Sequence, residues 1–196
     1  QRQKEIEKLS FKEQYLRGLC KLAHIEDCVE QWQHRAEQDT GLTEYLGLTG
    51  EEHKTFLCGG RDALAALLEP QRRKQRFVLY QLQLDEENAI PFAFKEITAL
   101  NAAGYQQPPA ALYYVAGSGE ICCPAEESDD ALLKRLFADC RERLPEGCRG
   151  RPMAISDVVE LNHGTKRAYY YVSGQDQFRQ VKFSPMLAKK EIPEKT

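Results

Sequence analysis

Residues 153–172, MAISDVVELNHGTKRAYYYV, decide the fold expected for this chain. Two runs rich in apolar and aromatic residues flank Asn162-His163-Gly164, a turn signature in which glycine tolerates a positive φ. A third run, FRQVKF, follows at residues 178–183. Successive strands with short links are typical of an antiparallel meander, so the C-terminal third is predicted to form three neighbouring strands.

Upstream of this meander, strand and helix patterns alternate. FVLYQLQL at residues 77–84 alternates as a strand does, and FKEITALNAAG at 94–104 has helical spacing and ends in glycine. ALYYVAGSGEI at 111–121 predicts a strand, a Gly-Ser-Gly turn and a short return strand. A second helix follows at 129–144, with Ser128 placed to cap it. The order predicts an α+β domain, with two helices packed on one face of a mostly antiparallel sheet.

The first part of the chain has a different period. Residues 1–70 carry apolar residues at helical spacing and predict a small helical module. Thr49 followed by Glu52 is a capping-box pattern, and Pro70 ends the last short helix. The expected organisation is this module, a charged connector at 71–76, the α+β domain at 77–184 and a tail at 185–196.

Composition narrows the possible functions. The net charge of −3 at pH 7 argues against a broad phosphate-binding surface. No apolar run is long enough to cross a bilayer, so no membrane role is expected. Seven cysteines, an odd number, match no disulfide framework and favour a reducing, cytoplasmic setting. No phosphate loop or zinc-protease motif appears, and no cofactor is predicted.

Residues 77–183 resemble a YodL domain. The resemblance is carried by the YQL of the first strand, by the block at 150–161 ending in SDVVEL, by AYYYV and by FRQVKF. Arg151, Pro152 and Ala154 replace the His, Ser and Ser usual in that block. These departures make catalysis through the block a weaker expectation.

A second resemblance lies in GLTEYLGLTGEEHKTFL at residues 41–57, which is similar to a segment in proteins of conjugative elements and plasmids of Gram-positive bacteria. There it often precedes YodL-like regions near antirestriction genes. The resemblance implies a mobile-element accessory protein, one form of which blunts host defence. It implies no reaction.

Three side chains offer a catalytic alternative. A hydrolase reading keeps Ser156, Asp157 and His163 as candidates, since a serine nucleophile needs a base within hydrogen-bond reach. The structural interpretation is that Ser156 and Asp157 bond local backbone where the incoming loop becomes a strand. The latter is favoured, and no catalytic residue is predicted.

A metal site is weighed and set aside. Cys20, His24 and Cys28 are spaced to share one helix face, and thiolate and imidazole bind zinc. A closed site needs four ligands, and two helical turns separate the first and last of these residues by about 12 Å. No metal is predicted.

The residues expected at an interaction surface are two arginines and four tyrosines. Arg149 and Arg151 flank a glycine in a loop, and tyrosines are frequent in protein interfaces. The tyrosines are Tyr113, Tyr169, Tyr170 and Tyr171. The leading prediction is a non-catalytic protein that binds a host or element macromolecule, with an antirestriction or anti-CRISPR type of inhibition as one form. A protein partner is expected, and nucleic-acid binding in the transfer machinery is the alternative.

Overall fold

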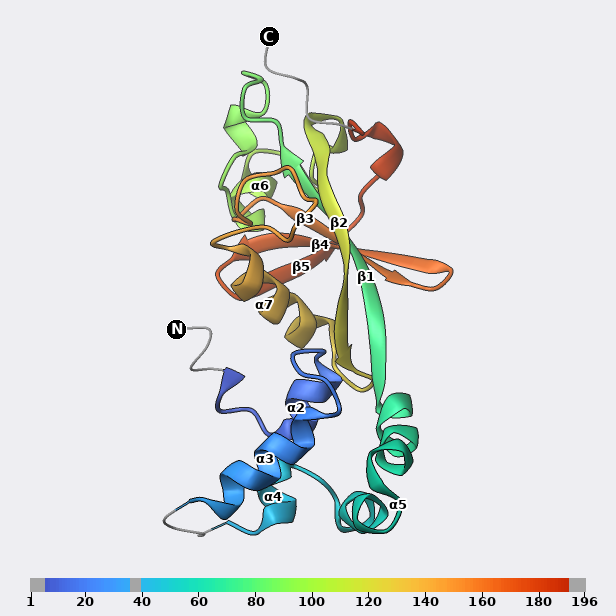
Figure 1. Ribbon diagram of the computed structural model, residues 1–196. Coiled ribbons are helices and arrows are strands. Elements are labelled where there is room, and N and C mark those ends of the chain that lie inside the picture. The colour runs from blue at the N-terminus through green and yellow to red at the C-terminus, as the bar shows by residue number, and fades with distance from the viewer. Residues whose placement is uncertain (1–5, 36–39, 191–196) are drawn as a thin grey trace. The chain divides into compact units, whose positions relative to one another are not determined.

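The computed structural model describes residues 6–35 and 40–190 (Figure 1). The chain divides into two compact units. The first comprises residues 1–74 and 121–127, and the second comprises 75–120 and 128–196.

The first unit is mainly helical, as predicted. Its α-helices are α2 (Phe11–Leu16), α3 (His24–Gln33), α4 (Leu42–Leu46) and α5 (Gly50–Leu68), and a 3₁₀ turn, η1 (Glu69–Gln71), follows. Phe11, Ile25, Leu46, Leu64 and Leu68 meet in one buried cluster. As the amphipathic spacing in the sequence predicts, the helices bury apolar residues against one another.

The helix boundaries of this unit show one confirmed cap and two breaks. The predicted capping box at Thr49 and Glu52 starts α5. A second box, at Ser10 and Glu13, starts α2, so a helix begins inside the stretch that has helical spacing. Gly60, with φ 70°, kinks α5. Ser10 interrupts the helical pattern because its hydroxyl serves the exposed amides of a new helix start.

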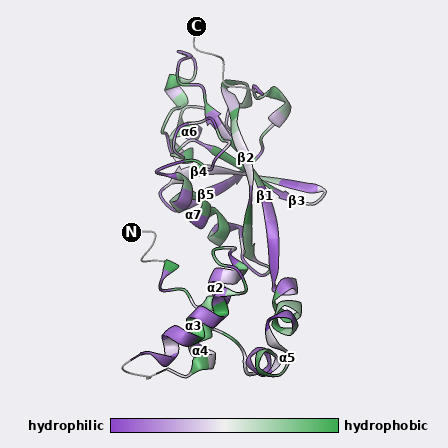
Figure 2. Cartoon of the chain, in the orientation of Figure 1, coloured by the Kyte–Doolittle hydropathy of each residue, from purple (hydrophilic) through white to green (hydrophobic). Residues whose placement is uncertain are grey.

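The second unit contains most of a five-stranded sheet in the order β2-β1-β3-β4-β5, while residues 72–74 of β1 and 121–124 of β2 belong to the first unit. The strands are β1 (Arg72–Leu82), β2 (Tyr113–Pro124), β3 (Val158–His163), β4 (Lys166–Gly174) and β5 (Gln177–Val181). β3 is antiparallel to both β1 and β4, and β5 is antiparallel to β4. The α+β class and the antiparallel meander are thus confirmed. Figure 2 shows the end of the β3–β4 hairpin in the colour of hydrophilic residues.

The two helices of this unit pack on opposite faces of the sheet. Tyr80, Val158 and Tyr171 lie opposite one another in adjacent strands and share a core with Leu100 of α6 (Ile97–Ala102). On the other face the Phe178 ring meets Phe137 of α7 (Asp129–Cys140), with ring centroids 6.2 Å apart. The prediction of one covered face is corrected in this respect: helical spacing shows that a helix has a buried stripe and does not show which face of the sheet receives it.

Three strand boundaries also differ from the expectation. β1 begins at Arg72, inside the stretch expected as a connector. β2 runs unbroken from Tyr113 through the Gly-Ser-Gly segment, where a turn was expected. β3 begins at Val158 instead of Met153, because Ser156 has φ 80° and interrupts the extended backbone.

Short turns complete the second unit. They are η2 (Ile90–Phe92), η3 (Ala110–Leu112) and η4 (Pro185–Leu187). Just after η4, Lys189 forms a parallel bridge to Tyr114, with Lys189 N donating to Tyr113 O over 2.8 Å. The part expected as a tail thus contributes hydrogen bonds to the edge of β2. Across residues 6–35 and 40–190, no helix combines the length and apolarity that a membrane span requires.

Candidate functional site

The Ser156-Asp157 turn is tied by its backbone to β4. Ser156 N donates to Val172 O at 2.9 Å, and Val172 N donates to Asp157 O at 2.8 Å. Ser156 Oγ accepts from Phe94 N at 3.1 Å. Both Ser156 and Asp157 are fully buried. The predicted bond to local backbone is confirmed for Asp157, whose carboxylate accepts from Ala154 N at 2.9 Å. The Ser156 hydroxyl instead accepts from an amide that is distant in the sequence.

The Asp157 carboxylate is surrounded by donors. It accepts from both terminal nitrogens of Arg151, at 3.1 and 2.5 Å, from Gln81 Nε2 at 2.9 Å and from Ala154 N at 2.9 Å. Burial raises the pKa of Asp157 to about 6, and the Arg151 guanidinium opposes that rise. At neutral pH the carboxyl is therefore mainly ionised and forms an ion pair with Arg151.

Gln81 on β1 is a part of this cluster that the sequence reasoning missed. Its amide nitrogen donates to Arg151 O at 3.0 Å as well as to Asp157, and its Oε1 accepts from Arg151 N at 3.0 Å and from the Tyr114 hydroxyl at 3.2 Å. The signal available in the sequence was a glutamine between apolar residues in YQLQL, and the structure shows that its side chain is fully buried. Such a group must find hydrogen-bond partners, so it marks a polar cluster in the core.

The loop at residues 93–97 is hydrogen-bonded to Ser156, beside this cluster, and to side chains of β4. Besides the bond from Phe94 N to Ser156, Ile97 N donates to Ser173 Oγ at 3.1 Å, and the Tyr171 hydroxyl donates to Lys95 O at 2.7 Å. Phe94 has φ 55°, which is uncommon for a residue with a side chain. Three hydroxyl groups therefore hold a strained loop in one place.

Arg151 reaches the same loop. Its guanidinium carbon lies 5.2 Å from the centroid of the Phe94 ring, a cation–π contact. Since this guanidinium also binds Asp157, Arg151 connects the buried carboxylate to the loop. Its side chain is 21% exposed.

The three residues of the hydrolase alternative do not come together. His163 Nε2 lies 3.0 Å from Asp129 Oδ2 of α7, and the Tyr170 hydroxyl donates to that same oxygen at 2.7 Å. β3 separates Asp157 from His163 by about 20 Å at the usual strand rise. Ser156 Oγ instead accepts a backbone amide. The geometry offers this serine no imidazole base.

The residues predicted for an interaction surface occupy different environments. Tyr113 and Tyr171 are core side chains, 1% and 0% exposed, and the Tyr113 hydroxyl donates to Ser156 O at 2.8 Å. Tyr169 and Tyr170 are half-buried. Hence the tyrosine run mainly packs the sheet against its two cover layers, one on each side.

The two arginines differ in the same way. Arg149 is exposed, whereas the guanidinium of Arg151 is engaged by Asp157. A role of this pair in binding stays a prediction, and Arg149 is the arginine that a partner can reach without breaking a buried ion pair.

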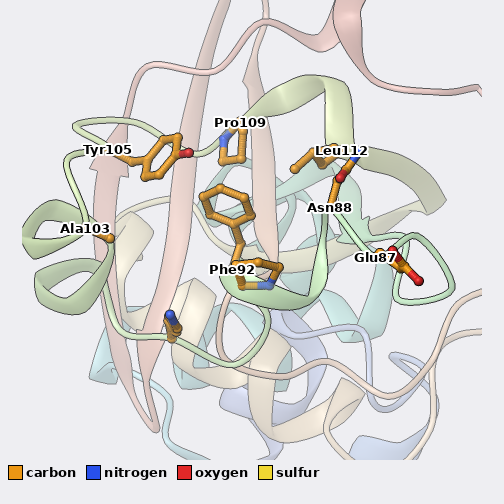
Figure 3. A pocket seen from close by; sticks show the side chains of 9 residues that line it. Glu87, Asn88, Phe92, Ala103, Tyr105, Pro109 and Leu112 are labelled. Carbon is orange, nitrogen blue, oxygen red and sulfur yellow. The ribbon is translucent and has the colours of Figure 1, made fainter.

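A pocket of about 470 Å³ lies outside every site that the sequence singled out (Figure 3). Its apolar lining consists of Pro91, Phe92, Ala103, Tyr105, Pro109 and Leu112. Figure 3 shows Phe92 near the middle, with Tyr105 and Ala103 to one side and Leu112, Asn88 and Glu87 to the other. The Phe92 and Tyr105 rings meet edge to face, with centroids 4.6 Å apart. All lining residues belong to the chain between β1 and β2.

Polar groups at this pocket are available for a ligand. Glu87, Asn88 and Lys95 line it, are exposed, and make no side-chain hydrogen bond or ion pair with any other residue of the described ranges. The carboxylate of Glu87 and the ammonium of Lys95 thus lie at the rim of a pocket with an aromatic floor, and they do not pair with each other. Such a mixture of apolar lining and a few polar groups is typical of binding pockets.

The cysteine and histidine cluster considered for zinc has no metal-site geometry. Burial raises the pKa of Cys20 to about 11 and also raises the pKa of Cys28. His24 Nδ1 lies 3.2 Å from Asp27. Wherever residues are described, no three His, Cys, Asp or Glu side chains gather as a metal site would need.

Comparison with protein families gives one finding. The model of the YodL-like domain matches residues 76–183, more than half of the chain. The chain belongs to the YodL-like domain family. The expected resemblance at 77–183 is thereby confirmed. No curated protein and no solved structure matches.

Both features described above lie inside the YodL-like domain. The cluster of Gln81, Arg151 and Asp157 and the pocket at residues 87–112 fall within the matched range. The cluster fastens the loop at 93–97, and that loop contributes Lys95 to the pocket rim. The YodL-like domain thus uses its buried polar residues to position one wall of its pocket.

Proposed function

We propose that this protein is a non-catalytic, cytoplasmic binding protein whose contact surface is the pocket segment, defined as residues 87–112. The partner is another protein. The observation that carries the proposal is the gathering, in this one segment, of an aromatic-floored pocket, unpaired polar side chains and exposed apolar side chains.

Exposed apolar side chains of the pocket segment support a protein partner. Ile90, Phe94 and Tyr105 are 59%, 55% and 44% exposed. Contiguous exposed apolar surface marks interaction sites, and these three side chains, which share the pocket segment, are proposed to contribute to such a surface. A partner that covers them removes apolar area from water at roughly 25 cal/mol per Å².

Non-catalytic action is supported by the use of the candidate catalytic groups. Ser156 and Asp157 are fully buried and bonded within the fold, and His163 pairs with Asp129. A serine nucleophile needs a base within hydrogen-bond reach and access to substrate, and Ser156 has neither. Their roles favour a stable binding scaffold over bond cleavage.

The proposed setting is a mobile genetic element, with the protein acting in counter-defence against a host restriction or CRISPR system. Two resemblances support it: the YodL-like domain and the segment at residues 41–57 that is similar to proteins of conjugative elements. The measurement is plasmid establishment in isogenic Gram-positive strains with and without a defence system. The protein raises establishment in the defended strain alone; an equal effect in both strains, or none, contradicts counter-defence.

A photo-crosslinking experiment tests the partner. Benzoylphenylalanine at position 94 replaces an exposed ring on the pocket segment, and the same probe at exposed position 142 serves as the matched control. Position 94 is expected to yield a discrete crosslinked protein in the host, whereas position 142 does not. Crosslinking at neither position, or equally at both, contradicts recognition through the pocket segment.

Nucleic-acid binding remains the second candidate because exposed cations stand at the end of the β3–β4 hairpin. Lys166 and Arg167 are exposed there, as Arg149 is elsewhere in the domain. Binding of this kind weakens steeply with salt. Loss of a salt-sensitive DNA or RNA shift in a variant with Arg149 and Lys166 changed to alanine supports it; the absence of any shift with the unmodified protein retires it.

A further inference from the structure

We infer that the pocket at residues 87–112 binds a short peptide segment of the partner, with an aromatic or aliphatic anchor side chain flanked by one basic and one acidic residue. The inference rests on the proposed function and specifies the chemistry of the partner. It is carried by the pocket floor, by two unpaired opposite charges and by apolar side chains outside the pocket.

The floor selects the anchor. Phe92 is 8% exposed and is held edge to face by Tyr105, so its position is fixed by packing. A pocket of about 470 Å³ accommodates one large side chain together with part of its backbone. Aromatic and aliphatic anchors that fill such pockets carry most of the binding free energy in protein interfaces.

The rim selects the flanking charges. Glu87 and Lys95 both line the pocket, and neither carboxylate nor ammonium has a side-chain partner among the residues described. A ligand with one positive and one negative group satisfies both at once. A ligand with two like charges places one of them beside a like charge, which lowers affinity.

Exposed side chains beyond the pocket favour a peptide over a small molecule. Ile90 and Phe94 adjoin lining residues in the chain, yet they are not part of the lining. A small molecule that fills the pocket leaves them in water. A peptide is long enough to continue past the pocket and reach the exposed part of such side chains, as the rim of a protein interface does.

The wall that carries Lys95 is fixed before any ligand arrives. Tyr171 binds the carbonyl of Lys95, while Ser156 and Ser173 bind the amides on either side of it, at Phe94 and Ile97. A wall already held in one conformation costs little ordering on binding. The backbone from which the Lys95 side chain extends is therefore held in one place.

The test uses blocked synthetic peptides with a central tryptophan and one charged residue on each side. The panel holds both mixed orders, the doubly acidic peptide and the doubly basic peptide. Because both orders are present, the result does not depend on the direction in which the peptide lies. Binding is followed by amide NMR shifts of the full chain, and residues 87–112 are expected to respond.

The expected result is that one mixed-charge peptide binds about fivefold more tightly than either like-charged peptide, as an exposed ion pair allows. Glu87→Lys shifts the preference to the doubly acidic peptide, and Lys95→Glu shifts it to the doubly basic one. Glu142→Lys, an exposed reversal of the same kind outside the pocket, changes nothing. All three side chains are exposed, so these variants are expected to fold.

Three results overturn the inference. If the peptide affinities do not depend on the peptide charges, either in the original protein or in the two charge-reversal variants, charged flanking residues are not required. Tryptophan amide binding as tightly as the best peptide assigns the pocket to a small aromatic ligand. If no peptide binds while the crosslink at position 94 still forms, the inference fails and the proposed function stands. Charge-selective peptide binding without any crosslinked partner supports the peptide specificity of the pocket and contradicts the proposed protein partner.

Discussion

The buried ion pair between Arg151 and Asp157 makes a sharp prediction for the variant Arg151→Ala. In the folded protein burial raises the pKa of Asp157 to about 6, above the value of 3.8 for the free side chain. A raised folded pKa means that the stability contributed by this group is fully present below pH 3.8 and is lost as pH rises through about 6. Above that pH the original protein shows no further loss from this carboxyl.

Removing the guanidinium extends this loss to higher pH. The carboxyl in Arg151→Ala keeps only Gln81 and the Ala154 amide as donors, so its pKa rises beyond about 6. Above about pH 6, until its own higher pKa is reached, the variant therefore continues to lose about 1.4 kcal/mol of unfolding free energy per pH unit, whereas the original protein loses no more from this carboxyl. The free energy of unfolding is expected to differ by a small amount near pH 5 and by about 3 kcal/mol near pH 8, in line with breaking a buried ion pair.

Urea unfolding followed by far-ultraviolet circular dichroism at about pH 5, 6, 7 and 8 measures this difference. Arg149→Ala is the matched control, since it removes an exposed arginine two positions away and is expected to give a small difference at every pH. A destabilisation by Arg151→Ala that is the same at all four values would refute the reasoning. It would mean that Arg151 acts through packing alone and does not hold the charge on Asp157.

Two substitutions probe the packing around this cluster. Gly150→Ala builds a Cβ 2.2 Å from Gln81 Oε1 and 2.7 Å from Ala116 Cβ. This overpacking is expected to lower the free energy of unfolding by about 2 kcal/mol and to lower the thermal midpoint. An unchanged midpoint would show that the loop moves freely. Tyr113→Phe deletes the hydroxyl that donates to the buried Ser156 carbonyl and is expected to cost about 1 kcal/mol in urea unfolding. A more stable Tyr113→Phe protein contradicts that role.

The meander was predictable because its signals are local. Alternation and a glycine turn at Gly164, with φ 71°, define β3 and β4 without reference to the rest of the chain. The Gly-Ser-Gly segment misled because its glycines serve packing instead of a turn. A Cβ at Gly117 would lie 2.2 Å from Cys148 Sγ, and one at Gly119 would lie 3.0 Å from the Phe77 ring. Close approach of this kind has no signature within the segment.

The site was less predictable because its parts are far apart in the sequence. Arg151 looked like a surface residue, since its partner Gln81 stands 70 positions away and nothing in the loop identifies Asp157 as buried. Residues 94–104 of the pocket segment showed helical spacing, and the residues on either side of them showed no period, so neither part gave reason to expect a concave surface. Only the fold brings Phe92, Tyr105 and Leu112 around one space.

The connection between β1 and β2 has a consequence for how such domains diversify. These strands are neighbours in the sheet, and the bond from Gln83 N to Leu112 O closes the base of the excursion between them. Two adjacent strands can be joined by a much shorter turn. The intervening chain is nevertheless no free insert, because its Phe92 and Leu100 share a buried core with Tyr80, Val158 and Tyr171. A relative that exchanged this excursion for another would therefore also have to supply a new apolar cover for that face of the sheet.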